Sequence, residues 1–285
     1  NYLASFYMWD YVGGRYSATS MVGGVLLSFL LGVEGFREIL RGAHAMDLHA
    51  LTEDPLKNLP LLSALLGVWN RNFLHYPTVA IIPYSQALLR FTAHLQQLDM
   101  ESNGKRVDRQ GRPCPFSTGP VIWGEPGTNG QHSFYQLIHQ GTDPTPLEFI
   151  GFHRSQYPAD LEVEQTISQE KLLANLFAQS IALATGQGSD NPNRAFPGNR
   201  PNRLLLGERL DPRTLGSLLA FYEHKVAFQG FIWGINSFDQ EGVQLGKRLA
   251  AQVLSLFRAK RRHEKVPAFP LAESYLRFLS FERQL

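Results

Sequence analysis

The sequence has little cysteine, since Cys114 is the only one in 285 residues. A single cysteine excludes an internal disulfide, so we expect a reducing environment and a cytoplasmic location. Cys114 lies between two prolines in a polar loop, and the sequence indicates no base beside it. We therefore expect an inert thiol, because a reactive one needs a neighbour that favours the thiolate.

Strong charge and long apolar runs are also missing. The net charge is +2 and 18% of the residues are charged, which is too mild to indicate a nucleic-acid partner. The basic cluster at residues 260–265 is interpreted as the solvated end of a helix. The longest apolar run, residues 21–33, is shorter than the roughly 20 residues that span a bilayer, so it predicts a buried helix and no membrane segment. No basic leader precedes it, and the chain opens on Asn1, which suggests a fragment or a processed product.

Motifs of common cofactor and metal sites are absent from the sequence. No G-x-G-x-x-G follows a predicted strand, so a dinucleotide-binding fold is not supported. Residues 242–247 miss the phosphate-loop pattern by one residue and lack its strand. No HExxH motif occurs, and no Cys/His pairs have the spacing of zinc ligands. The sequence therefore predicts no metal site.

What the sequence does contain is an alternation of short apolar runs and helical patterns. The predicted strands are residues 78–84, 121–124, 147–152 and 203–208. The helices that follow them are predicted at residues 88–98, from 133 to a Gly141 C-cap, 172–181 and 215–228. This order predicts an α/β fold, a three-layer αβα sandwich with a parallel sheet, plus C-terminal helices at about 238–257 and 272–280. Residues 185–202 hold too many Gly, Pro and Asn for regular structure.

Two segments place single charges at predicted helix ends. Glu101, in MESNGK, ends a helix, because Ser-Asn-Gly turns the chain. The negative end of the helix dipole favours a protonated carboxyl there, which suits a group that takes up and returns a proton; the alternative is a solvated glutamate in a turn. Arg15 follows two glycines and precedes the apolar helix, a setting for an anion or a developing oxyanion. The alternative is a surface arginine in a capping turn.

Two further segments carry candidate side chains. The Gly-rich loop 124–131 follows a predicted strand, where α/β sheets bind ligands, and it places His132 at the start of the next helix. A neutral imidazole there could exchange protons with a hydroxyl, or it could pack beside Phe134 and Tyr135. Ser237 and Gln240 have capping-box spacing, so a helix is predicted to start there and to put Lys247 on the face of Gln240. Lys247 could hold an anionic or hydroxyl-rich ligand, or lie on a solvated surface.

Several of these segments together resemble one enzyme family. GEPGTNGQHSFYQLIHQG (124–141) and GSLLAFYEHKVAFQGFIWGINSFDQEGVQLGK (216–247) resemble the signature segments of the phosphoglucose isomerase family. WDYVGGRYS, DMESNGK and FPGNRPN are similar to that family as well, and the resemblance extends from the first residues to about 257. It implies interconversion of glucose 6-phosphate and fructose 6-phosphate in glycolysis and gluconeogenesis, with no metal or organic cofactor. It also implies a homodimer whose chains each hold two sugar-isomerase domains.

The resemblance implies a role for each matching residue. Glu101 is similar to the base that moves a proton between C1 and C2 through a cis-enediol, and Arg15 to the arginine that steadies the enediolate. His132 resembles the ring-opening histidine, which reaches into the partner subunit's site, and Lys247 the lysine that assists it. The sugar contacts implied in addition are Gly14, Gln97 and Gln240.

The chain also departs from the family pattern, because the family is roughly twice as long. The missing half carries the Ser-Lys-Thr-x-Thr loop that grips the phosphate, so we expect these residues alone to be close to inactive. The implied division is residues 1–55 as the tail of the first sugar-isomerase domain, 56–235 as the second, and 236–285 as C-terminal helices. Gln244 stands where the family usually has Glu, and Glu125 is expected to hold its loop. The alternatives are a non-catalytic sugar-phosphate-binding module or a secreted signalling form.

Overall fold

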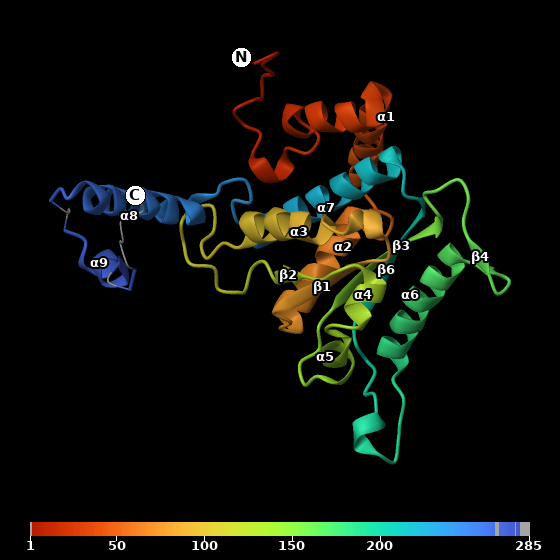
Figure 1. Ribbon diagram of the computed structural model, residues 1–285. Helices are drawn as coiled ribbons and strands as arrows, with labels where there is room; N and C mark the ends of the chain where they lie inside the picture. The colour runs from red at the N-terminus through yellow and green to blue at the C-terminus, as the bar shows by residue number, and fades with distance from the viewer. Residues whose placement is uncertain (1, 266–267, 277, 280–285) are drawn as a thin grey trace. The chain divides into compact units, whose positions relative to one another are not determined.

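A computed structural model describes residues 2–265, 268–276 and 278–279 of the chain, in two compact units. The first unit runs to Phe238 and the second begins at Asp239. The first unit is built on a four-stranded parallel sheet with the strand order β2-β1-β3-β6, which confirms the α/β prediction (Figure 1). Its strands are β1 (Thr78–Pro83), β2 (Val121–Trp123), β3 (Leu147–Arg154) and β6 (Asn202–Arg209). The proposed boundary between residues 55 and 56 stays a prediction.

Helices cover both faces of this sheet and make the expected three layers (Figure 1). One face packs against α3 (Phe91–Gln96) and α7 (Pro212–Trp233), and the other against α5 (Tyr135–Gln140) and α6 (Ser168–Thr185). The remaining elements of this unit are η1 (Gly14–Tyr16), α1 (Met21–Ala50), α2 (Leu59–Val68), η2 (Trp69–Phe73), η3 (Gln86–Leu88), η4 (Gln97–Glu101), α4 (Gly127–Gln131), η5 (Pro192–Arg194) and the small hairpin β4 (Glu162–Val163) and β5 (Thr166–Ile167).

The central strand β1 shows why a short apolar run becomes a buried strand. Successive side chains of a strand point to opposite faces. Val79 and Ile81 belong to the core beneath α3 and α7, whereas Ala80 and Ile82 belong to the core beneath α5 and α6. Because both faces are covered, an uninterrupted apolar sequence is needed, and this pattern marks parallel sheets.

Helix α1 differs from its prediction as a buried helix. It extends well beyond the apolar run, to Ala50, with a break in helical geometry at Gly32 (φ 75°). Its first half is largely exposed, as at Phe29 with 89% of its surface accessible. The stretch Gly14–Ala50 contains an 18-residue window with a mean hydropathy of 1.6, and it is long and apolar enough to cross a membrane by length and composition. That is weak support for a membrane span, because a core helix or a signal sequence passes the same test.

The second half of α1 is fixed by a close crossing with α7. A Cβ added at Gly42 of α1 would lie 1.8 Å from the carbonyl oxygen of Arg213. Reciprocally, a Cβ added at Gly216 of α7 would lie 1.9 Å from the carbonyl oxygen of Ile39. The two backbones therefore approach as only glycines allow. Ser217 adds a hydrogen bond across the crossing, from its hydroxyl to the carbonyl of Gly42 at 2.8 Å.

The second unit contains η6 (Glu241–Val243), α8 (Gln244–Arg262) and α9 (Pro270–Leu276), with Leu256, Ala272 and Leu276 buried between them. Of the basic cluster, residues 260–262 form the last turn of α8 and 263–265 follow it, with 261–265 exposed, as predicted for a solvated helix end. The prediction of a helix that starts at Ser237 was wrong. Helix α8 begins seven residues later, and Gln240 precedes a 3₁₀ turn. The end of the helix predicted to residue 280 lies outside the described residues. In the loop 185–202, one short 3₁₀ turn, η5, is the only helical element described.

Candidate active site

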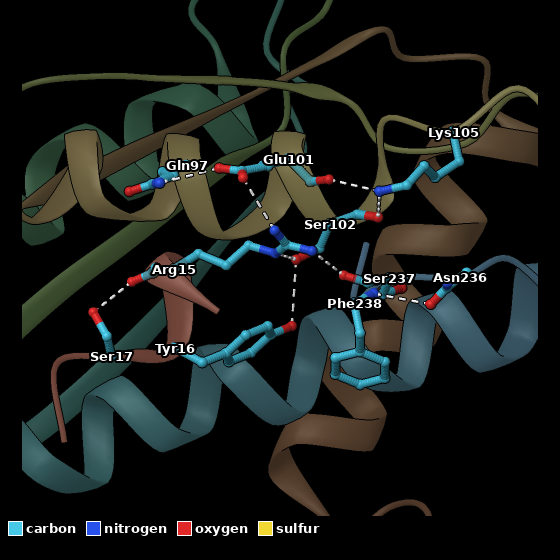
Figure 2. A network of polar contacts seen from close by, with 11 residues as sticks. Arg15, Tyr16, Ser17, Gln97, Glu101, Ser102, Lys105, Asn236, Ser237 and Phe238 are labelled. Carbon is cyan, nitrogen blue, oxygen red and sulfur yellow. Dashed lines mark hydrogen bonds and ion pairs between the residues drawn. The ribbon is translucent and has the colours of Figure 1, made fainter. Parts of the chain in front are cut away.

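Arg15 and Glu101 form an ion pair at the centre of a polar network in the first unit (Figure 2). The guanidinium Nη1 lies 3.1 Å from the Glu101 Oε1, and the carboxylate side chain is 18% exposed. Glu101 is the last residue of η4, and Arg15 lies in η1, 86 residues earlier. The structure thus brings together the two residues whose types suit a proton-transferring base and an oxyanion-stabilising cation.

Arg15 is held by two further acceptors. Its Nε donates to the Ser102 Oγ at 2.7 Å, and its Nη2 donates to the Ser237 carbonyl at 2.6 Å (Figure 2). The residue is only 2% exposed, so the alternative of a surface arginine is wrong. The α1 N-terminus is capped by Ser20 instead, whose hydroxyl accepts from the Val22 N–H. The guanidinium therefore has a fixed plane, set by acceptors from two distant parts of the chain.

Gln97 and Gly14 lie beside this pair. The Gln97 Nε2 donates to the Glu101 Oε2 at 3.0 Å, so both carboxylate oxygens of Glu101 have a fixed donor. A Cβ added at Gly14 would stand 3.8 Å from the same Nε2. Three of the residues implied by the resemblance thus surround Glu101: Arg15, Gln97 and Gly14. Their contact with a sugar stays a prediction.

The helix that carries Glu101 ends in a π-helical turn, η4, rather than in an ordinary α-helical one. Such turns are rare and occur often at functional sites. Lys105 donates to the carbonyls of Glu101 and Ser102 at 2.7 and 2.8 Å. Because an ammonium group caps these carbonyls, the negative helix end that the sequence predicts is compensated. The suitability of Glu101 as a base therefore rests on its fixed position and not on the helix dipole.

The Gly-rich segment before His132 is held in place by close backbone contacts and one side-chain hydrogen bond. Gly124 adopts φ 137°, and a Cβ there would lie 2.1 Å from the Ile81 carbonyl oxygen. Gly127 approaches the ring of Tyr84 so closely that a Cβ would stand 2.3 Å from it. The Gln131 side chain also donates to the Tyr84 hydroxyl at 2.8 Å. The loop is thereby pinned to the buried end of β1.

His132 itself lies in a different place from the one predicted. It caps the C-terminus of the short α4 and precedes α5, so it does not start a helix. Its side chain is exposed and makes no hydrogen bond or ring contact with the described residues, which removes the alternative of packing beside Phe134 and Tyr135. The elements that carry His132 and Glu101 pack on opposite faces of the sheet (Figure 1).

Two other predicted features of the first unit have different outcomes. Glu125 is exposed, and its carboxylate has no hydrogen bond or ion pair with the described residues, so the structural role expected for it is not supported. Cys114 is partly exposed, and burial raises the pKa of its thiol, which fits an inert residue. In the described part of the chain no three His, Cys, Asp or Glu side chains are grouped to hold a metal ion.

Gln240 and Lys247 belong to the second unit, where Lys247 lies exposed in the first turn of α8. Their role beside Glu101 stays a prediction. The capping box expected at Ser237 and Gln240 is wrong, because the Ser237 hydroxyl donates instead to the Asn103 Oδ1 at 2.7 Å. Gln240 is therefore not on a helical face with Lys247.

Sequence reasoning missed a buried charged cluster beneath η4. The Glu148 carboxylate of β3 accepts from Lys225 at 2.7 Å and from the Tyr222 hydroxyl at 3.0 Å, and it also pairs with Arg203. Asp99 lies fully buried nearby, and desolvation by burial raises its pKa from 3.8 to about 6. The signal that could have found this cluster is a charged residue inside an apolar run, as in LEFIGF.

The fold and the site define an αβα-sandwich protein with a carboxylate–guanidinium pair beside its parallel sheet. The family model described as phosphoglucose isomerase matches residues 3–268, and the chain belongs to that family. It is 64% identical over 278 residues to the glucose-6-phosphate isomerase of Protochlamydia amoebophila, and 58% identical over 280 residues to that of Chlamydia muridarum. These matches cover 98% of this chain but 52% and 53% of the relatives, so the chain spans about half their length.

One solved structure agrees with this assignment, and a second one shares the fold. A crystal structure of a glucose-6-phosphate isomerase from Chlamydia trachomatis superposes with a TM-score of 0.90 at 57% identity, covering 96% of this chain and 51% of that one. The crystal structure of hypothetical protein TT0462 from Thermus thermophilus gives a TM-score of 0.70 at 30% identity, covering 86% of this chain and 56% of that one.

Proposed function

We propose that the complete protein to which this chain belongs interconverts glucose 6-phosphate and fructose 6-phosphate through a cis-enediol intermediate. The observation that carries the proposal is the Arg15–Glu101 ion pair, 3.1 Å long, in which a buried guanidinium faces a partly exposed carboxylate. The family to which the chain belongs supports the choice of substrate. No metal or organic cofactor is part of the proposal.

The chemistry needs two groups at the carbons that change oxidation level. Glu101 takes the proton from C2 of the open-chain aldose and returns it to C1, while a hydroxyl proton moves from O2 to O1. Negative charge develops on the sugar oxygens during this transfer, and Arg15 stabilises it. Because three acceptors already fix the guanidinium, little reorganisation is needed when that charge appears.

Ring opening is assigned in the proposal to His132 and Lys247. His132 is exposed and stands on the face of the sheet opposite to Glu101, which supports the idea that it acts in the site of a second copy of the chain. We therefore propose a homodimer as the active assembly. We also propose that it is located in the cytoplasm. Gly14, Gln97 and Gln240 would line the sugar site.

The proposal is tested with the Glu101→Gln variant of the complete protein. We expect isomerisation to be abolished while glucose 6-phosphate still binds, because the amide keeps the shape of the side chain but cannot accept the proton. Glu125→Gln is the matched control, since this glutamate is exposed and makes no hydrogen bond with the described residues. Unchanged turnover in Glu101→Gln would remove Glu101 from the mechanism.

Turnover and glucose 6-phosphate binding also test two further points: the activity of the 285-residue chain alone, and the alternative of a non-catalytic binding module. The 285-residue chain by itself should show little turnover, because the binding energy that holds the sugar's phosphate is assigned to the other half of the protein. Turnover close to that of the complete protein would contradict this expectation. A complete protein that binds glucose 6-phosphate without converting it would be a non-catalytic sugar-phosphate-binding module, and the proposed activity would be wrong.

A further inference from the structure

We infer that Asn103 is a positioning residue that fixes the guanidinium of Arg15 through Ser237. The inference rests on the proposed function, because it assigns Asn103 a role in the reaction that Arg15 serves. Asn103 touches neither Arg15 nor the expected substrate position directly. Its effect passes through one hydrogen bond to a hydroxyl and one carbonyl on the same residue, Ser237.

The carboxamide of Asn103 is held at both ends. Asn103 is 0% exposed, its Nδ2 donates to the Val226 carbonyl of α7 at 3.1 Å, and its Oδ1 accepts from the Ser237 hydroxyl at 2.7 Å. A flipped amide would set its NH₂ group against the Ser237 hydroxyl and its oxygen against a carbonyl, so only one orientation satisfies both partners. The acceptor offered to Ser237 therefore has a defined position.

Ser237 links this carboxamide to Arg15. Ser237 is 2% exposed, and its carbonyl oxygen accepts from the Arg15 Nη2 at 2.6 Å. The space for its hydroxyl exists because residue 230 of α7 is glycine: a Cβ there would lie 1.9 Å from the Ser237 Oγ. Side chain and carbonyl belong to one residue, so the hydroxyl anchor also limits how far the carbonyl can turn.

The backbone of Asn103 is itself rigid. Its carbonyl accepts from the Lys105 N–H at 2.8 Å and from the Gly119 N–H at 3.0 Å. The two residues before it, Glu101 and Ser102, contact Arg15 directly. The tripeptide 101–103 thus takes part in three restraints on the guanidinium, two by direct contact and one through Ser237. Losing the third should let the guanidinium swing within its plane while the charge stays in place.

The test compares the variants Asn103→Ala, Ser237→Ala and the double variant in the complete protein. We expect kcat to fall on the order of 10- to 100-fold with KM changed less than about threefold, because the misplaced cation affects the transition state more than sugar binding. The double variant should be no slower than the slower single one, since both remove the same restraint. Asn58→Ala is the matched control: Asn58 is 1% exposed, caps α2 and donates to two carbonyls, so its loss should lower stability and leave kcat unchanged.

Crystal structures of the same variants give a readout that does not depend on turnover. In Asn103→Ala the Ser237 carbonyl should turn away and the Arg15 Nη2 contact should lengthen beyond hydrogen-bond range. An unmoved guanidinium, or a kcat equal to that of Asn58→Ala, overturns the inference. If the unaltered complete protein does not isomerise sugar phosphates, the proposed function fails, and the position of Arg15 in these structures still decides whether Asn103 positions it.

Discussion

Arg15→Lys asks whether the planar guanidinium, and not only its charge, is needed at this site. Arg15 uses three different nitrogens for three acceptors: Glu101, Ser102 and Ser237. A lysine carries the same charge on a single nitrogen at the end of a flexible stem, so it cannot reach all three acceptors at once. The substitution keeps the positive charge and removes the planar group with its several N–H donors.

The expected size of the effect follows from these contacts. Removing one donor from an oxyanion-stabilising site typically lowers kcat by about 10²- to 10³-fold, or roughly 3–4 kcal/mol. Because lysine keeps the charge, we expect the lower end, on the order of 10²-fold. The buried Ser102 hydroxyl and Ser237 carbonyl lose a charged donor, which should cost about 1–3 kcal/mol of folding stability.

The assay follows glucose 6-phosphate formation from fructose 6-phosphate by a coupled dehydrogenase, at a temperature where urea titration shows the variant folded. Arg37→Lys is the matched control, since Arg37 lies exposed on α1 and pairs only with Glu34 in the described residues. A kcat for Arg15→Lys within about threefold of the unaltered protein would refute the reasoning, because charge alone would then suffice. A large rise in KM with kcat unchanged would also refute it, since Arg15 would then bind substrate and transition state alike.

Two further predictions concern stability and association. Burial raises the pKa of Asp99 to about 6, against the opposing charge of Lys225, so the folded state holds this proton more tightly than the unfolded state does. Asp99 should therefore contribute a fall on the order of 3 kcal/mol in the free energy of unfolding as pH rises from about 4 to about 6. Urea titrations of Asp99→Asn should show a shallower slope than the unaltered chain, the remainder belonging to groups such as Glu223, whose pKa burial raises to about 7; an unchanged slope would assign all of it to other groups. The exposed apolar face of α1 should make the isolated chain self-associate, and replacing Leu26, Phe29 and Leu30 by Gln, Ser and Gln should shift sedimentation toward the monomer. Equal sedimentation before and after the change would contradict this.

The strands of the sheet were predictable because each is decided locally. β1 and β3 are short, largely apolar runs that each follow a proline, Pro77 or Pro146, and both faces of a parallel sheet need apolar side chains. The α5 helix likewise ends at Gly141, as its C-cap residue predicts. Four such runs in sequence, separated by helices, predict a parallel sheet covered by helices and leave few other architectures.

The errors arose where a distant partner decides the outcome. The capping-box rule looks only at residues 237–240, but Ser237 bonds to Asn103, 134 residues away. The burial of Arg15, which the sequence left open, likewise depends on acceptors 86 to 222 residues along the chain. Helix α4 forms from GTNGQ, a poor helix sequence, and its Gly127 lies against the ring of Tyr84, 43 residues earlier in the chain. The apolar run of α1 predicts that the helix can bury an apolar face. It does not predict whether this chain contains a segment that covers that face.

The positions of Glu101 and His132 determine how substitutions of these two residues would combine when two different chains form one dimer. Glu101 and His132 are carried on opposite faces of one sheet. In the proposed dimer each catalytic centre then takes its carboxylate from one chain and its imidazole from the other. A hybrid of one chain without the carboxylate and one without the imidazole contains one doubly defective centre and one intact centre. Two inactive homodimers that exchange subunits should therefore regain activity by complementation.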